Sequence, residues 1–219
     1  MVKNFRVVET EHIKAMEVHE YVKGFIGKPL FGVDLQEIAE AVELHPWVAS
    51  VAIRRAPPHE VVIEPIERTT IALAHFVMPA KAGIQSRSVN LDWLIDEHGN
   101  PFKMLRRREV LDLPVIKAKR ASSQYLQLAA AAIRSYALTK QLTGKISEIV
   151  MDNEVSLKVV FSSGLMVELG NDKFSEKWLK LEKIWMSLSK DSERLAYIYL
   201  GDYPNPQQVA VKFKVANDS

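Results

Sequence analysis

The sequence predicts an α+β fold, in which a small β-α-α-β-β unit precedes a larger antiparallel or mixed β domain with flanking helices. Two patterns support this prediction. Within the first 70 residues, strand-like segments bracket two segments whose apolar residues recur at helical spacing. Beyond them, two longer helical segments are embedded among many short strand-like segments. A composition of 47% hydrophobic and 26% charged residues excludes a disordered chain and supports a buried core.

Five elements are expected in the small unit. They are a strand at 5–13, helices at 16–26 and 35–45, and strands at 48–55 and 60–76. Gly24 and Gly27 stop the first helix, whereas Asp34 is the expected N-cap of the second helix. The second helix ends before Pro46, because the residue preceding a proline is driven out of the helical conformation.

The larger domain begins with a break in the pattern at 77–90, where Pro79, Gly83 and polar residues predict an exposed loop. This segment resembles peptides encoded by dispersed bacterial DNA repeats, so we interpret it as an insertion. The elements expected after it are strands at 91–97 and 101–105, a basic loop at 106–120, a helix at 123–142 capped by Ser122 or Ser123, three strands within 147–169, a helix at about 174–189, and strands at 196–201 and 208–215. We therefore predict two domains, at 1–70 and at 71–219.

No recognisable catalytic or ligand-binding constellation appears in the sequence. It has no cysteine, its six histidines show no metal-ligand spacing, and it lacks phosphate-binding and nucleophile motifs. A net charge of +2, with one aromatic residue near the basic stretch at 106–120, argues against nucleic-acid binding. Trp178 and Trp185 share a predicted helix face with Phe174 and Leu181, which is typical of core packing. We therefore predict no enzyme activity, no cofactor, no metal site and no nucleic-acid partner.

Eight segments, in the right order, resemble the extracytoplasmic part of the bacterial cell-division family FtsQ, also called DivIB. They are KPLFGVD at 28–34, HPWV at 45–48, IRRAPP at 53–58, ER at 67–68, IA at 71–72, LIDEHG at 94–99, DLP at 112–114 and VELG at 167–170. Each segment is weak evidence alone, but the ordered set extends over almost the whole chain.

The resemblance implies a POTRA (polypeptide-transport-associated) domain at about 5–70 and a β-rich domain after it. It implies a non-catalytic divisome scaffold that recruits other division proteins, chiefly FtsB and FtsL, at the septum on the periplasmic face of the inner membrane. The family's transmembrane anchor has no counterpart here, because no stretch approaches the roughly 18 apolar residues of a membrane span. The family's D-L-R-Y motif is replaced by YLGDY at 199–203, so that only Tyr203 carries over.

We expect the last strand, at 208–215, to bind a partner by strand addition at its sheet edge, where an unpaired strand offers backbone N–H and C=O groups. The side chains expected to face a core are those of Val209, Val211, Phe213 and Val215, and those expected on the other face are Ala210, Lys212 and Lys214. Lysines on an edge limit uncontrolled pairing, and they would attract an acidic partner segment.

The resemblance implies that the FtsB-binding surface includes the tyrosine of the motif and, by position, part of the last strand. The residues so assigned are Tyr203, Val209, Ala210, Val211, Lys212 and Phe213. From the residues alone, a closing strand with a solvated edge is the favoured interpretation, and the resemblance reverses that preference.

Two other functions stay open. A POTRA-type chaperone or assembly module of an outer-membrane or secretion system requires a downstream barrel or tandem repeats, and the roughly 145 residues after the small unit are too few and too helical for a barrel. A soluble enzyme with an unrecognised site requires a pocket of convergent titratable groups. The sequence predicts no particular oligomeric state.

Overall fold

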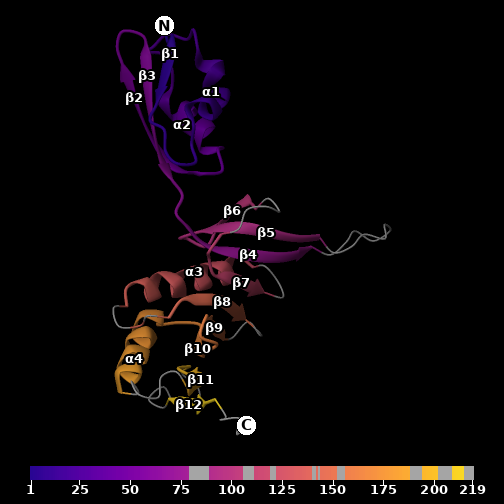
Figure 1. Cartoon of the computed structure of the whole chain (residues 1–219). Helices are drawn as coiled ribbons and strands as arrows, with labels where there is room; N and C mark the ends of the chain where they lie inside the picture. Colours follow the sequence, from indigo (N-terminus) through magenta and orange to yellow (C-terminus); the bar gives the residue numbers. More distant parts are fainter. Residues whose placement is uncertain are drawn as a thin grey trace. The chain divides into compact units, whose positions relative to one another are not determined.

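The computed structural model describes residues 1–78, 89–105, 111–118, 122–139, 142, 144–151, 156–187, 194–201 and 209–214. The chain forms two compact units, Met1–Thr69 and Thr70–Ser219. Figure 1 traces both units from the indigo N-terminus to the yellow C-terminus.

The first unit combines a three-stranded sheet with two helices. In the sheet, β1 (Asn4–Val7) runs parallel to the central strand β3 (Glu60–Glu67), and β2 (Val48–Ala56) runs antiparallel to it. Helices α1 (Ala15–Val22) and α2 (Leu35–Glu43) follow β1 in the chain. Buried apolar residues of the sheet and of both helices form one core. The predicted β-α-α-β-β order is therefore confirmed.

Local sequence explains how the helices of this unit begin and end. The side chain of Asp34 accepts a hydrogen bond from the backbone N–H of Gln36 at 2.8 Å, so the predicted N-cap of α2 is confirmed. Ile38 and Val42, one turn apart on α2, are fully buried. Helix α1 is shorter than predicted, because the chain tightens into the 3-10 helix η1 (Lys23–Phe25) around Gly24, a poor helix former.

The single strand predicted at 60–76 is wrong. The segment forms two strands in different sheets, β3 in the first unit and β4 (Thr70–Met78) in the second unit. Between them, Arg68 donates its backbone N–H to the carbonyl oxygen of Trp47 at 2.8 Å and its Nε–H to that of Pro46 at 3.1 Å. These bonds end the antiparallel ladder between β3 and β2. The residues from Thr70 onward belong to β4, which pairs within the sheet of the second unit.

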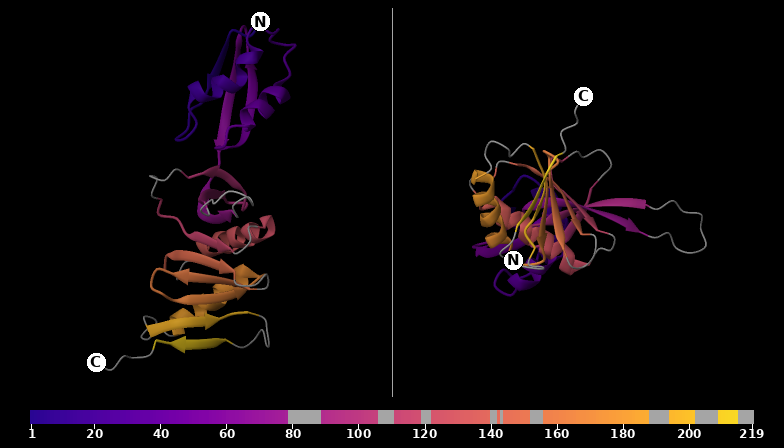
Figure 2. Two further views of the ribbon diagram at one scale, coloured as in Figure 1. Left: turned by 90° about the vertical axis from the view of Figure 1, so that its right-hand side faces the viewer. Right: turned by 90° about the horizontal axis from the view of Figure 1, so that it is seen from below.

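Within its described residues, the second unit is a nine-stranded mixed sheet with two helices. Its strand order is β12-β11-β10-β9-β8-β7-β4-β5-β6. The strands other than β4 are β5 (Val89–Asp96), β6 (Pro101–Met104), β7 (Val115–Ala118), β8 (Ile146–Met151), β9 (Leu157–Phe161), β10 (Met166–Gly170), β11 (Leu195–Tyr199) and β12 (Ala210–Phe213). Helices α3 (Ser123–Ala137) and α4 (Phe174–Ser187) pack on one face of this sheet (Figure 2). The α+β fold class predicted from the sequence is therefore confirmed.

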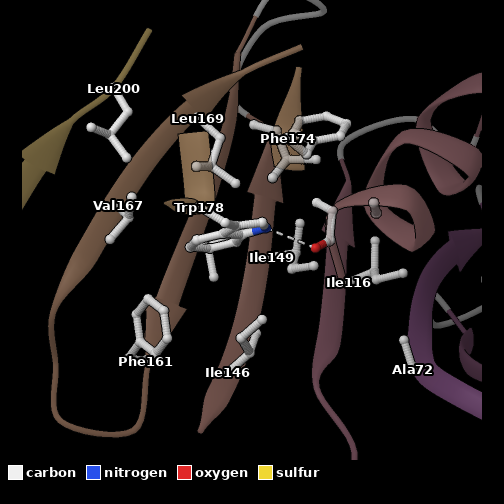
Figure 3. Close-up of a cluster of buried hydrophobic side chains, with 14 of the residues drawn as sticks. Ala72, Ile116, Ile146, Ile149, Phe161, Val167, Leu169, Phe174, Trp178 and Leu200 are labelled. Atoms are coloured by element: carbon white, nitrogen blue, oxygen red, sulfur yellow. Dashed lines mark hydrogen bonds between the residues drawn. The ribbon is translucent and has the colours of Figure 1, made fainter. Parts of the chain in front are cut away.

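Trp178 of α4 lies at the centre of the second core (Figure 3). It is fully buried, and its Nε1–H donates to the carbonyl oxygen of Ala132 in α3 at 3.0 Å. The rings of Tyr136 and Phe161 meet it edge-on, with centroids 4.9 and 6.2 Å away. The predicted core-facing side of this helix is therefore confirmed.

The two loops predicted in the second unit, at 106–120 and at 77–90, have different outcomes. The loop predicted at 106–120 is wrong in part, because this segment contains the strand β7, which pairs in parallel with both β4 and β8. Parallel pairing brings together segments that are far apart in sequence, so local pattern could not reveal β7. Most of the loop predicted at 77–90 lies outside the described residues, and at its ends Met78 closes β4 and Val89 opens β5.

Candidate functional site: the outer edge of the large sheet

Strand β12 is the outermost strand at one end of the large sheet (Figure 2, yellow). It pairs antiparallel with β11, opposing Val211 to Ile198 and Lys212 to Tyr197. No strand borders its other side within the described residues. The strand that the sequence analysis selected for partner binding therefore lies at a sheet edge.

A backbone hydrogen bond shows which groups of β12 face outward. The N–H of Lys214 donates to the carbonyl oxygen of Arg194 at 2.6 Å, so Lys214 directs its backbone groups toward β11. Successive residues of a strand direct these groups to opposite edges. The N–H and C=O groups of Val211 and Phe213 consequently face the outer edge, where an added strand would bond.

The side chains of β12 alternate as predicted, with one difference. Val209 and Val211 pack against the core, and Ala210 and Lys212 are exposed on the opposite face. Phe213, predicted to face a core, is 40% exposed. It lies at the last position of an edge strand, so neighbouring strands cover its ring from one side only. An apolar surface is therefore present at the strand's end.

The face of the sheet opposite α3 and α4, which no described helix covers, is here called the open face. On it, the hydroxyl of Tyr197 donates to one carboxylate oxygen of Glu168, and the Ser156 hydroxyl donates to the other at 2.7 Å. Burial raises the pKa of the Tyr197 phenol above its ordinary value, and the Glu168 carboxylate raises it further. Tyr197 therefore stays a neutral donor beside Lys212.

Tyr203, the motif residue assigned to the partner surface, lies outside the described residues. The two residues described just before this segment, Leu200 and Gly201, make close contacts with the sheet. The N–H of Leu200 donates to the carbonyl oxygen of Glu168 at 2.8 Å. A Cβ atom added to Gly201 would lie 2.5 Å from the hydroxyl oxygen of Tyr199. Gly201, which departs from the family motif, thus leaves space for the Tyr199 ring.

Sequence reasoning did not find the contribution of β11 and β10 to this site. On the open face, Tyr197 lies next to β12 and Glu168 lies one strand further in, and Arg194 orients the backbone of β12. Strict alternation in LAYIY would put Tyr197 on the face of the buried Leu195, so the position of Tyr197 depends on the bulge between these two residues, which only the strand pairing reveals. The pairing of β10 with β11 is parallel and non-local, so no local pattern in the sequence indicated that Glu168 contributes to this site.

Within the described ranges, no group of three or more histidine, aspartate or glutamate residues is placed to hold a metal ion. None of the described helices is both long enough and apolar enough to cross a membrane.

Comparison with known proteins assigns both units to one family. Residues 85–200 match the family described as Cell division protein FtsQ/DivIB, C-terminal, and residues 1–68 match the FtsQ-type POTRA domain. Relatives named Cell division protein FtsQ share 27% identity with the chain. They include the proteins of Myxococcus fulvus (196 residues, 85% of this chain and 64% of the relative), Geotalea daltonii (217 residues, 92% and 72%) and Neisseria gonorrhoeae (185 residues, 82% and 65%).

The chain spans about three-fifths of the length of the first curated relatives that it matches. The C-terminal family match alone covers more than half of the chain. The order of the matches follows the chain, with the POTRA domain first and the C-terminal domain second. This chain belongs to the FtsQ/DivIB family, whose members are non-catalytic bacterial cell-division proteins that lie on the periplasmic side of the membrane at the septum.

Proposed function

We propose that this chain is a divisome scaffold that recruits other division proteins, FtsB and FtsL among them, by strand addition to the outer edge of β12. The proposal places it on the periplasmic face of the inner membrane at the septum, through its family. The observation that supports it most is the outward direction of the Val211 and Phe213 backbone groups on a strand that closes the sheet.

The chemistry of the edge indicates what a partner segment should look like. Its backbone would bond to Val211 and Phe213, and a residue packed on the exposed Phe213 ring would be apolar. On the open face, Lys212 is exposed, so an acidic residue opposite it would be favoured. We therefore expect an extended segment in which apolar and acidic residues alternate.

A POTRA-type chaperone or assembly module of an outer-membrane or secretion system is the second candidate function. The POTRA match at residues 1–68 fits both functions. The match of residues 85–200 to the FtsQ/DivIB C-terminal domain favours the division scaffold, because the second unit belongs to that family specifically. That match ends before β12, so the edge assignment rests on the geometry described above.

Calorimetric titration of the chain with the periplasmic part of FtsB tests the proposal. We expect Tyr203→Ala to weaken binding at least tenfold (about 1.4 kcal/mol) while the melting temperature stays nearly unchanged. Tyr21→Ala serves as the control variant, since Tyr21 lies in α1 of the other unit. Unchanged affinity in Tyr203→Ala would remove Tyr203 from the site, and no binding by the wild-type chain would refute the scaffold proposal.

A further inference from the structure

A charged side chain occupies a core position of α4. The buried residues of this helix are Phe174, Lys177, Trp178 and Leu181, which follow the i, i+3, i+4, i+7 spacing of a helix face that packs on a core. Three of them are apolar and belong to the core of the second unit, whereas Lys177 carries an ammonium group and its side chain is only 6% exposed. A lysine is almost never buried to this extent without a specific partner.

The burial of the Lys177 ammonium has a cost, because water solvates a charge better than the interior of a protein does. An apolar residue of similar length, such as methionine, would fill the same position without that cost. Departures from the pattern that a core favours are concentrated at functional sites. The surroundings of the ammonium should therefore show what the buried charge does.

The ammonium lies where the chain leaves two adjacent strands. The strands β10 and β11 run parallel, so their carboxyl ends lie at the same edge of the sheet. A Cβ atom added to Gly170, the last residue of β10, would lie 3.3 Å from Nζ of Lys177 and 3.8 Å from the Cα of Gly201, just beyond β11. The Lys177 ammonium, Gly170 and Gly201 thus meet at one place.

The turn that leads from β10 into α4 is tied to this ammonium. Nζ of Lys177 donates to a carboxylate oxygen of Asp172 at 2.8 Å. Gly170 and Lys173 both have positive φ, 75° and 48°. That conformation is unfavourable for a lysine and persists only where the surrounding structure imposes it. The contact between Asp172 and Lys177 joins the turn to the helix and supplies such a restraint.

The same place is the start of the connection from β11 to β12. Leu200 and Gly201 are buried, and the N–H of Leu200 donates to the carbonyl oxygen of Glu168 in β10 at 2.8 Å. In the sequence, the chain continues from Gly201 through Tyr203 to β12. A shift of Gly201 would therefore move the start of the connection on which the proposed partner site depends.

We propose that Lys177 is a positioning residue for the partner site. Its buried ammonium holds the carboxyl ends of β10 and β11 together and so fixes the point at which the chain leaves the sheet toward Tyr203 and β12. The inference rests on the proposed strand addition at β12. It adds a residue that acts from the core, through Gly170 and Gly201, rather than by contact with the partner.

Calorimetric titration with the periplasmic part of FtsB, combined with thermal unfolding, tests the inference. We expect Lys177→Met to weaken binding about fivefold or more. Its melting temperature should fall by no more than about 3 °C, because Asp172 is half exposed and water can solvate its carboxylate.

Leu181→Val is the matched control, since Leu181 is fully buried on the same face of α4. It should lower the melting temperature by about 2 °C or more and leave the affinity within about twofold of the wild type. A merely structural role for Lys177 would give both variants this second pattern, and that result would overturn the inference.

A milder variant keeps the lysine in place. Asp172→Asn removes the charge that anchors the ammonium, and it should weaken binding about threefold. If Lys177→Met does not fold, this variant decides, and an unchanged affinity in Asp172→Asn would then contradict the inference.

Amide hydrogen exchange of the free chain gives a readout that does not need the partner. Lys177→Met should speed exchange of the Leu200 amide at least about tenfold, whereas the amide of Ile149, in the middle of the sheet, should exchange as slowly as in the wild type. An unchanged Leu200 amide, or an unchanged affinity in Lys177→Met, would overturn the inference. Absence of binding by the wild-type chain would instead refute the scaffold proposal, and the Leu200 amide would still decide whether Lys177 holds this end of β11.

Discussion

The backbone N–H of Lys214 donates to the carbonyl oxygen of Arg194, and this contact shows which backbone groups of the outermost strand point toward β11. Because the even-numbered residues of β12 direct their backbone N–H and C=O groups toward β11, those of Val211 and Phe213 face the outer edge of the sheet.

Proline at position 213 removes an outward N–H without removing a bond to β11. We expect Phe213→Pro to bind the periplasmic part of FtsB about tenfold more weakly than Phe213→Ala, which loses the same ring and keeps the N–H. Titration calorimetry measures this difference, and circular dichroism should show similar melting temperatures for both variants. Equal affinities would show that no added strand bonds at position 213.

Lys212 should act on the rate of association more than on the lifetime of the complex. It is exposed on the open face, where long-range attraction to an acidic segment is screened by salt. We expect Lys212→Glu to slow association about threefold or more at low ionic strength, with the difference vanishing at high salt. Surface plasmon resonance measures both regimes. Lys183→Glu, an exposed change on α4, is the control and should have no such effect.

The turn between β5 and β6 packs closely on α3, and this predicts unequal costs for two glycine substitutions. Gly99 and Gly164 both have positive φ, 86° and 83°. A Cβ atom on Gly99 would lie 2.6 Å from backbone atoms of Gln127, whereas one on Gly164 would meet nothing within 4 Å. Gly164→Ala should cost about 1–2 kcal/mol of unfolding free energy through backbone strain alone.

Gly99→Ala should cost about 1–3 kcal/mol more than Gly164→Ala, because helix backbone cannot move aside as a side chain can. Urea denaturation of the two variants, followed by far-ultraviolet circular dichroism, gives the comparison. Similar midpoints for the two variants would contradict the packing of this turn against α3.

The surroundings of Glu67 lead us to expect that the unfolding free energy of the first unit depends on pH. Burial favours its neutral form, but the Thr10 hydroxyl, together with hydrogen bonds from the ring and the backbone N–H of His12, outweighs burial and holds the pKa of Glu67 below its ordinary value. The His12 ring is also stacked on Trp47, with centroids 3.8 Å apart. A carboxyl group whose pKa is lowered by folding contributes stability above its unfolded pKa of about 4.3.

That contribution is lost as the pH falls through the lowered, folded pKa. We expect Glu67→Gln to lose about 0.5–1 kcal/mol at neutral pH and to show a flatter loss of stability on acidification. Denaturation of the variant and the wild type at a series of pH values, followed by far-ultraviolet circular dichroism, measures both effects. Parallel curves for the variant and the wild type would contradict the role given to Glu67.

Features with a local cause were predictable from the sequence. The N-cap Asp34 and the apolar face that carries Trp178 are set by residues within one or two helical turns, and both were predicted. Features that depend on distant segments were not predictable. The chain crosses from β3 to β4 without a glycine or proline between them, so alternation alone suggested one strand.

The same distinction applies to the candidate site. Alternation in the last strand predicted which side chains of β12 share a face, and Val211 and Lys212 confirm it. The exposure of Phe213 depends on β12 being an edge strand, which only the pairing of nine strands decides. The neighbouring Tyr197–Glu168 contact depends on the parallel pairing of β10 with β11.

Amide hydrogen exchange at single residues, measured by nuclear magnetic resonance, tests strand addition most directly. In the free chain, the amides of Val211 and Phe213 should exchange quickly, whereas those of Lys212 and Lys214 should be protected by β11. Adding the periplasmic part of FtsB should protect Val211 and Phe213 by at least about tenfold, in alternation along β12. Binding that leaves both amides exchanging as fast as in the free chain would show that the partner does not add a strand at this edge.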